Sequence, residues 1–304
     1  MAQISATTLA NKGELTLTQL RNIGFLKTQS SNDFTTDSAG GATAIATGVK
    51  VPNRAIGVDE NGNPLKNITE LLAEKGFVSG IVTTDQITGA TPSSFYAHQK
   101  DRDMAEAIND DFLKSKLSVF VSSSDAASQG KNNIGSFQMQ ASMEEIGNSK
   151  KEKIGFLFSG ITSPASLSNA VKNVLNYLDK KSKPFFLMVE GAKIDSNGHS
   201  NTIGGVIDES IAFDKAITEA LKFADSDKNT LIIITADHET GGLTLPQGNI
   251  AISEIEGDFT TDDHTGIMVP VFAYGPRSNE FQGIYENNIL FEKIINALGV
   301  STED

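Results

Sequence analysis

Carboxylate and imidazole side chains that could bind a metal ion recur at the ends of apolar segments in this sequence. Asp195 and His199 are four residues apart, so one helical turn would point both side chains in the same direction. Asp237 and His238 are adjacent and follow an apolar run, and His264 precedes another. Because carboxylate and imidazole together form a zinc-type ligand set, these five residues indicate zinc binding.

Other side chains at comparable positions indicate a hard cation and an anionic substrate. Glu190 and Thr91 supply only oxygen atoms, which suits magnesium. Ser38 stands at the start of a predicted helix, in TTDSAGGATAIATG at 35–48, where the residues behind it are almost all small. Arg102 lies further along the chain and could bind an anion.

Each of these residues also has a plain structural explanation. The Asp-Ser pair could be a helix cap, Asp195 and His199 a surface pair, and the Asp237-His238 dipeptide part of a turn. His264 and Arg102 could be exposed, and we expect His98 to be a hydrogen-bonded structural residue outside the site. The functional interpretation therefore rests on their joint placement at strand ends, where open α/β sheets gather their functional groups.

The elements that would position these residues are short apolar runs alternating with helical patterns. The runs are continuous, which suits parallel strands buried on both faces. Helical spacing fills the intervening segments. We therefore predict a three-layer α/β/α sandwich with a mostly parallel central sheet. The runs are 78–84, 117–121, 154–158, 184–189, 230–235 and 268–274, and the helices 67–75, 165–180, 205–225 and 287–298.

Composition limits the classes of function. The 304 residues suit one domain over 1–304, with a polar surface excursion at about 122–153. A net charge of -13 argues against nucleic acid and anionic membranes as partners, and repels anionic substrates unless metal ions supply positive charge. With no Cys, thiolate metal sites and disulfides are excluded. We expect a soluble protein, since no segment approaches the ~18 apolar residues of a membrane span.

Five segments together resemble the alkaline phosphatase family. They are TTDSAGGATAIATGVK, ATPSSFYAHQKDR, FFLMVEGAKIDSNGH, TADHETGG and HTGIMVPVFAYGP, in the family's order and reaching across nearly the whole chain. The resemblance implies a metal-dependent phosphomonoesterase with a phosphoserine intermediate, two zinc ions and one magnesium ion. The segments between them are short, so large crown insertions are not expected.

The resemblance also implies a role for each residue of the site. Ser38 would be the nucleophile and Arg102 would grip the phosphate. The first zinc would be bound by Asp195, His199 and His264, the second zinc by Asp237 and His238, and magnesium by Thr91 and Glu190.

The sequence departs from the family pattern in two places. Family members normally begin with an apolar strand that ends in Asp-Gly-Met-Gly, and its Asp bridges the second zinc and the magnesium. This chain starts at MAQISATTLANKG, which matches sequence just after that turn, so we expect unpaired strand edges. At Gly89 the family usually carries Asp or His, which orients water around the third metal.

These departures leave two alternatives open besides an active phosphomonoesterase. One is a truncated homologue with an incomplete second zinc and magnesium site and little turnover. The other is a phosphodiesterase or sulfatase on the same core. The expected partners are small phosphate monoesters, and homodimers are common in the family. The family points to a periplasmic or extracellular location, although the amino terminus has no basic region followed by an apolar run.

Overall fold

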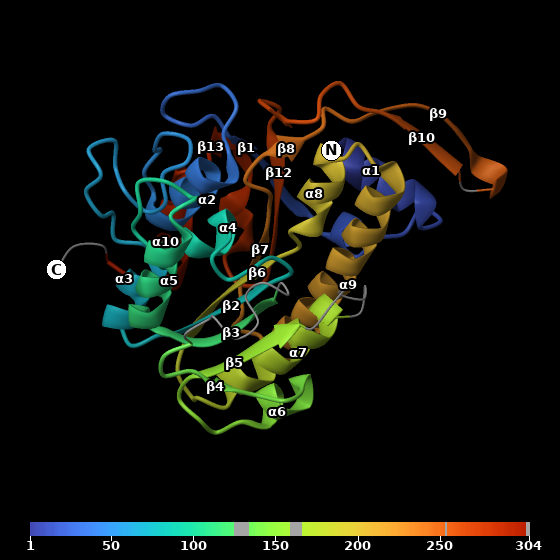
Figure 1. Ribbon diagram of the computed structural model, residues 1–304. Helices are drawn as coiled ribbons and strands as arrows, with labels where there is room; N and C mark the ends of the chain where they lie inside the picture. Colours follow the sequence, from blue (N-terminus) through green and yellow to red (C-terminus); the bar gives the residue numbers. More distant parts are fainter. Residues whose placement is uncertain (125–133, 159–165, 253, 302–304) are drawn as a thin grey trace.

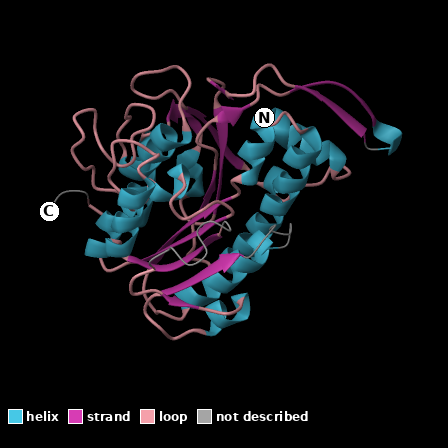
Figure 2. Ribbon diagram, viewed as in Figure 1, coloured by secondary structure: helices cyan, strands magenta, loops and turns pink. Residues whose placement is uncertain are grey.

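The fold is an α/β sandwich in which strands lie between two layers of helices (Figures 1 and 2). The computed structural model describes residues 1–124, 134–158, 166–252 and 254–301. The predicted α/β fold class is confirmed.

Five of the described strands form a parallel sheet. All four pairings in this sheet are parallel. Its carboxyl edge therefore presents several strand ends to the same region. In spatial order the strands are β4 (Gln138–Met139), β5 (Ile154–Phe158), β3 (Leu117–Ser123), β2 (Val78–Thr83) and β6 (Phe185–Glu190).

Four further strands form a mixed sheet. The pairing of β1 with β13 is parallel, whereas β12 is antiparallel to both β1 and β7. Two short antiparallel pairs lie beyond the two sheets. The order in the mixed sheet is β13 (Gly283–Glu286), β1 (Asn22–Lys27), β12 (Val269–Tyr274) and β7 (Ile232–Ile234), and the short pairs are β8 (Glu239–Thr240) with β11 (His264–Thr265) and β9 (Thr244–Asn249) with β10 (Glu254–Asp258).

The predicted apolar runs all become strands, but not in one continuous sheet. Four of them lie in the parallel sheet and the other two, β7 and β12, in the mixed sheet. The expectation of a single hydrogen-bonded sheet is therefore wrong. Among the described residues, β6 and β7 are edge strands of two different sheets, and a cavity of about 1030 Å³ lies between them. The expectation of unpaired strand edges is confirmed at these two strands.

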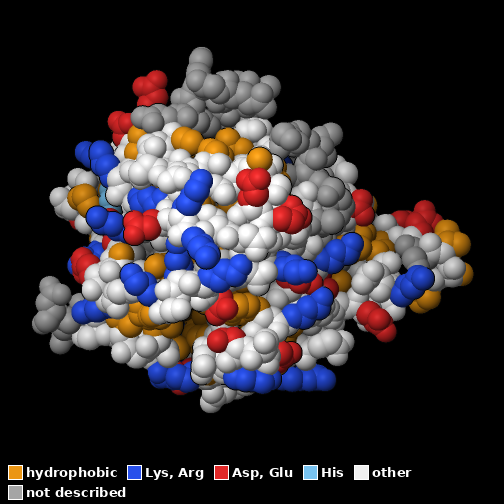
Figure 3. Space-filling view, turned by 90° about the horizontal axis from the view of Figure 1, so that it is seen from below, with side chains coloured by type: hydrophobic (Ala, Val, Ile, Leu, Met, Phe, Trp, Pro, Cys, Tyr) orange, Lys and Arg blue, Asp and Glu red, His pale blue; other side chains and the backbone are white. Residues whose placement is uncertain are grey.

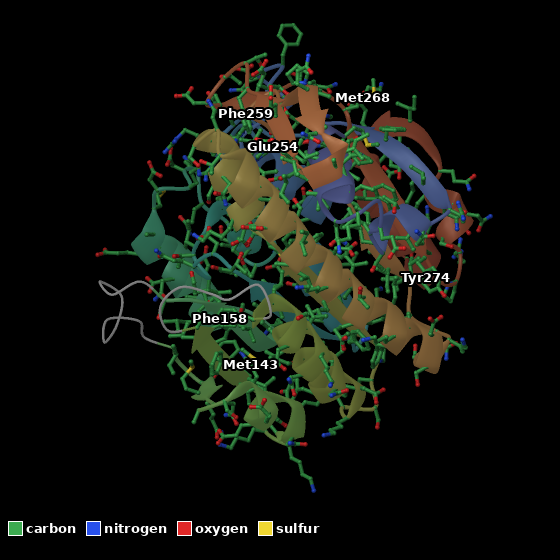
Figure 4. All side chains as sticks on the ribbon, turned by 90° about the vertical axis from the view of Figure 1, so that its right-hand side faces the viewer. Met143, Phe158, Glu254, Phe259, Met268 and Tyr274 are labelled. Atoms are coloured by element: carbon green, nitrogen blue, oxygen red, sulfur yellow. The ribbon has the colours of Figure 1, made fainter. Side chains whose placement is uncertain are left out.

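Helices cover both faces of the strands. One layer packs into an apolar core with β2 and β3, and the other packs against the opposite face. Figure 4 shows α9 crossing the molecule diagonally, with Phe259 near its beginning and Tyr274 near its end. The first layer holds α2 (Ser38–Thr47), α3 (Ile68–Glu74), α4 (Ala90–Ser93), α5 (Ala105–Lys114) and α10 (Ile289–Leu298), and the second α1 (Ala2–Ala10), α6 (Met143–Asn148), α7 (Ser166–Asp179), α8 (Lys193–His199) and α9 (Ile203–Asp227).

Local capping explains where several helices begin and end. Asn67 caps α3 through its side chain, and Glu70 returns a bond to the Asn67 backbone, which completes a capping box. Gly299 ends α10 in a left-handed conformation, as its position after the last apolar residue predicts. The helices predicted at 67–75, 205–225 and 287–298 are confirmed, and so is the described part of the one at 165–180.

The polar segment at 122–153 takes part in the fold through its second half. β4 pairs with β5, and Met143 and Ile146 of α6 are buried against α7. The rest of this predicted excursion includes 125–133, which lie outside the described residues. The single-domain assignment stays a prediction.

The surface carries interspersed charges. Figure 3 shows acidic and basic side chains side by side on the lower face, with hydrophobic side chains visible between them. Within the described residues, no helix is both long enough and apolar enough to cross a membrane.

Candidate metal centre

The predicted site residues converge where the strand ends meet the start of α2. Glu190 ends β6, Asp237 follows β7, and Ser38 is the first residue of α2. These three side chains line one cavity, together with Thr91, Arg102, Asp195 and His238.

Asp37 fixes the start of α2 and therefore the position of Ser38. Its Oδ1 accepts hydrogen bonds from the amides of Gly40 (2.9 Å) and Arg54 (3.0 Å). The small residues behind Ser38 permit a close approach, because a Cβ on Gly41 would lie 3.0 Å from the carbonyl oxygen of Asp237. Ser38 is thus held, nearly buried, against the loop that carries Asp237 and His238.

The hydroxyl of Ser38 faces an imidazole. Its Oγ lies 3.1 Å from Nε2 of His238, whose ring is buried. On the other side of that ring, Nδ1 lies 3.2 Å from the hydroxyl of Thr240. Thr240 also donates to Asp195 at 2.5 Å, so one hydroxyl links the two Asp–His groups of the site.

Asp195, His199 and His264 form a compact group of potential ligands. The Nε2 atoms of the two histidines are 3.1 Å apart, and they lie 3.4 and 3.6 Å from the carboxylate oxygens of Asp195. Their other ring nitrogens face backbone oxygens of Asp262 and Thr36, at 2.7 and 2.8 Å. These outer bonds orient both imidazoles so that Nε2 is free to bind a metal.

The spacing of this group fits a zinc ion. Ligand atoms placed tetrahedrally around zinc at its usual bond lengths are roughly 3.3 Å apart. Burial lowers the pKa of His264, and the charge of His238 lowers it further, which favours the neutral imidazole that binds metals. Among the described residues, this is the group of His and acidic side chains whose ligand atoms all lie within 4.8 Å of one another.

Asp237 and His238 form a second, smaller group next to the first. Their Oδ2 and Nε2 atoms are 3.4 Å apart. Oδ2 of Asp237 is buried without a hydrogen-bond partner, which suits an atom reserved for a cation. The rings of His238 and His264 stack with centroids 3.5 Å apart, so the two groups are immediate neighbours.

Glu190 lines the same cavity as Asp237 and is close enough to be affected by its charge. It accepts hydrogen bonds from the hydroxyls of Thr83 and Thr91. Burial raises the pKa of Glu190 to about 8, and the charges of Asp85 and Asp237 contribute to the rise. A cation here would favour the ionised carboxylate, and the oxygen-only donors fit magnesium.

Arg102 and His98 make different kinds of contact. Nη1 of Arg102 donates to Oδ2 of Asp37 at 3.0 Å, which holds the guanidinium beside the start of α2. His98 lies away from the site. Its ring nitrogens face the carbonyl of Gly57 at 2.8 Å and the carboxylate of Glu70 at 3.0 Å, so its structural role is confirmed.

One acidic residue of this region was not singled out from the sequence. Asp85 follows β2 and lines the same cavity. A Cβ added to Gly89 would overlap Oδ2 of Asp85, so this carboxylate occupies the space that a side chain at residue 89 would need. Its position just beyond a buried strand, in the series VSGIVTTD, is the signal that could have identified it.

The arrangement defines a class: an α/β protein in which potential metal ligands lie beside a serine hydroxyl. A sequence profile described as alkaline phosphatase matches residues 1–144 and 111–257. Alkaline phosphatase 3 of Bacillus subtilis is 28% identical over 86% of this chain and 77% of its own length. The repressible alkaline phosphatase of Saccharomyces cerevisiae is 33% identical over 73% of this chain and 48% of its own.

Solved structures agree with the sequence comparisons. The alkaline phosphatase of the Antarctic bacterium TAB5 superposes with a TM-score of 0.90 at 38% identity, over 99% of this chain and 95% of that one. A variant of that protein has magnesium bound in its M3 site. The cold-active alkaline phosphatase of Shewanella sp. superposes with a TM-score of 0.89 at 26% identity, over 98% of this chain and 96% of that one. The chain belongs to the alkaline phosphatase family, whose members are phosphomonoester hydrolases.

Proposed function

We propose that this chain hydrolyses small phosphate monoesters through a phosphoserine intermediate on Ser38. Two zinc ions and one magnesium ion would be its cofactors. The first zinc would be held by Asp195, His199 and His264, the second zinc by Asp237 and His238, and magnesium by Thr91 and Glu190.

The observation that carries this proposal is the contact between Ser38 and His238. The Oγ atom of Ser38 lies 3.1 Å from Nε2 of His238, and Oδ2 of Asp237 has no hydrogen-bond partner. A cation bound by these two residues would therefore be close enough to activate the serine. Zinc bound there would lower the pKa of the serine hydroxyl, and a zinc held by Asp195, His199 and His264 would be the ion available to stabilise the oxygen of the leaving alcohol on the opposite side of phosphorus.

The chain's own residues account for the two chemical steps. The oxygen of Ser38 forms a bond to phosphorus while the bond from phosphorus to the ester oxygen breaks, and the alcohol leaves with a proton. Water then cleaves the phosphoserine and releases inorganic phosphate. Arg102, held by Asp37, can donate two hydrogen bonds to the phosphoryl oxygens, and the start of α2 also favours an anion.

A second candidate, a homologue with impaired turnover, is favoured by one specific observation. The cavity between β6 and β7 extends to Ser38 and Asp237, so the sheet beneath the site is open. Catalysis depends on rigid placement of the reacting groups, and an open sheet weakens it. The rate at which the zinc- and magnesium-loaded chain hydrolyses a chromogenic phosphate monoester distinguishes the two candidates. Efficient turnover supports the phosphomonoesterase, and little or no turnover supports the impaired homologue.

The proposed roles are tested by comparing Ser38→Ala with His264→Ala. After incubation with substrate and an acid quench, mass spectrometry should find phosphate on the Ser38 peptide of the unmodified chain and none in Ser38→Ala. Zinc content should remain nearly unchanged in Ser38→Ala and fall in His264→Ala. Equal zinc loss in the two variants would contradict the separation of nucleophile and ligand.

A further inference from the structure

Arg54 lies close to the site in a backbone conformation that its residue type rarely adopts. The amide of Ala55 donates to the carbonyl of Pro52 at 3.2 Å and closes a turn, in which Arg54 is the third residue with a φ of 74°. Gly or Asn usually takes such a position, because a bulky side chain disfavours the left-handed region. A strained residue persists where its contacts hold it, so the contacts of Arg54 indicate its role.

The backbone of Arg54 is bonded to the residue that fixes the start of α2. Its amide donates to Oδ1 of Asp37 at 3.0 Å. The other carboxylate oxygen of Asp37, Oδ2, accepts from Nη1 of Arg102 at 3.0 Å. Asp37 therefore joins Arg54 to Arg102 at the position directly before Ser38.

The side chain of Arg54 binds both acidic neighbours of Arg102. Its Nε and Nη2 atoms donate to the two carboxylate oxygens of Asp101, each at 2.8 Å, and Nη2 also donates to Asp103. Oδ1 of Asp101 accepts in turn from the Asp103 amide at 2.9 Å. The hydrogen bonds from Arg54, together with the one from the Asp103 amide, lower the pKa of Asp101 to about 2, so the ion pair persists at neutral pH.

These contacts leave Arg102 available for an anion. Asp101 and Asp103 adjoin Arg102 in the sequence, and either carboxylate could otherwise pair with its guanidinium. Because Arg54 binds both, the ion pair of Arg102 within the described part of the chain is with Asp37. The Arg102 side chain is 31% exposed and lines the same cavity as Ser38, so an anion can reach it.

We propose that Arg54 is a positioning residue for phosphate binding. Its guanidinium holds Asp101 and Asp103, and thereby keeps Arg102 beside Ser38 for the phosphoryl group of a monoester. Arg54 acts through Arg102 and is not among the residues that line the cavity. The inference rests on the proposed function, in which Arg102 binds the phosphate.

The test removes the guanidinium of Arg54 and keeps its backbone conformation. Arg54→Asn suits this purpose, because Asn tolerates the left-handed region. Arg54→Lys keeps the positive charge but loses the planar fork that binds a carboxylate through two bonds. Both variants should retain the amide bond to Asp37.

The chain offers a matched control at Arg277. This arginine also has a positive φ, of 59°, and its Nε and Nη2 atoms donate to the carboxylate of Glu280. It follows β12, which is antiparallel to β7, so it lies at the end of the sheet opposite to the site. Arg277→Asn therefore removes a similar side chain from a similar backbone without affecting Arg102.

The affinity for inorganic phosphate is measured by calorimetry on the chain loaded with zinc and magnesium. Arg54→Asn should weaken phosphate binding at least about threefold, and Arg54→Lys should weaken it too, whereas Arg277→Asn should leave it unchanged. In an Arg102→Ala background, Arg54→Asn should have no further effect, because its influence passes through Arg102. Zinc content should be equal in all variants.

Three results would overturn the proposal. They are unchanged phosphate affinity in Arg54→Asn, an equal loss of affinity with and without Arg102, and a loss of zinc in Arg54→Asn. If Arg54→Asn does not fold, Arg54→Lys carries the same comparisons.

Failure of the proposed function would give a different result, namely no phosphate binding by the unmodified loaded chain. The role of Arg54 is then decided on the metal-free chain. The amides of Asp103 and Met104 donate to Asp101, so they should exchange with deuterium faster in Arg54→Asn than in Arg277→Asn. Equal exchange in these two variants would show that Arg54 does not hold the segment that carries Arg102.

Discussion

Asp85 is the residue whose placement bears most on the proposed magnesium site at Thr91 and Glu190. Gly89 lacks the side chain that family members usually carry there, yet the carboxylate of Asp85 fills that space. It lies close enough to Glu190 to raise the pKa of that carboxyl. We therefore expect Asp85 to supply an oxygen donor, direct or through water, to magnesium bound at Thr91 and Glu190.

Asp85→Asn should weaken magnesium binding at least about tenfold, equivalent to about 1.4 kcal/mol, because it removes a negative charge from the site. Calorimetric titration with magnesium measures the change, and zinc content should stay the same. Asp258→Asn, on the exposed strand β10, is the matched control and should have no effect. Unchanged magnesium affinity in Asp85→Asn would remove Asp85 from the site.

At this scale, residue type and position at a strand end predicted which side chains meet. Ser38, His238 and Asp237 come together because β7 and α2 both end or begin at one edge of the sheets. The outer contacts could not be predicted. Thr240 reaches Asp195 only because α8 packs against β8, and Asp85 reaches Gly89 only through the local turn after β2.

Among the elements, helix α2 can pack closely against the loop that carries Asp237 because Gly41 has no side chain. A Cβ on Gly41 would lie 3.0 Å from the Asp237 carbonyl oxygen and 3.1 Å from its Cβ. Gly41→Ala should therefore displace α2 from the Asp237 loop, lower the free energy of unfolding by about 1–3 kcal/mol, and reduce phosphatase activity.

The matched control is Gly204→Ala, in the first turn of α9. A Cβ there would meet nothing within 4 Å, so the substitution should raise the free energy of unfolding by up to about 1 kcal/mol. Urea unfolding of both variants measures the two changes. The packing argument fails if Gly41→Ala is as well tolerated as Gly204→Ala.

The ion pair between Glu70, at the start of α3, and His98 should make a pH-dependent contribution to stability. Burial alone would lower the pKa of His98, but the hydrogen bond and charge of Glu70 raise it above 6.5. Burial opposes ionisation of Glu70, yet its bonds to His98 and the Asn67 amide lower its pKa below 4.5. The ion pair therefore stabilises the fold most between the ordinary pKa values of the two groups, 4.5 for Glu70 and 6.5 for His98. Its contribution is lost as pH rises through the folded pKa of His98 or falls through that of Glu70.

Glu70→Gln should lower the free energy of unfolding by about 1 kcal/mol near pH 5.5, and by less at pH 8.5, where His98 is neutral. Urea unfolding at the two pH values measures the difference. Glu74→Gln, at the exposed end of the same helix, should show no comparable pH dependence. A Glu70→Gln effect that is independent of pH would mean that the cap, and not the ion pair, is the source of the stability.

Element type was predictable where the hydrophobic pattern is long. The helices at 205–225 and 287–298 and the buried parallel strands follow their periodicity directly. β1 was missed, because in NIGFLK a glycine and a lysine interrupt the apolar run, and its pairing with β12 and β13 is a long-range contact. The sequence also could not show that β6 and β7 are not paired with each other, since both read as buried strands.

For the whole molecule, charge balance is the property that couples metal binding to stability. The chain carries a net charge of -13, and Asp85, Glu190, Asp195 and Asp237 gather around one cavity. Without cations these groups disfavour one another's ionised forms, which is one reason why the pKa of Glu190 is raised to about 8. Bound metal ions would compensate locally for the negative charge of the carboxylates. Metal binding to the folded chain should then stabilise it by mass action.

Removing metal with a chelator should accordingly lower the melting temperature, and zinc should restore it. At a free zinc concentration 100 times the Kd, one site contributes about 2.7 kcal/mol. Asp195, His199 and His264 provide three ligands, whereas Asp237 and His238 provide two, so zinc titration should fill the three-ligand group first. His264→Ala should lose most of the stabilisation at low zinc while keeping the weaker response at high zinc. Sodium chloride at matched ionic strength controls for screening of the surface charge. Equal shifts in the variant and the unmodified chain would mean that zinc acts elsewhere on this acidic surface.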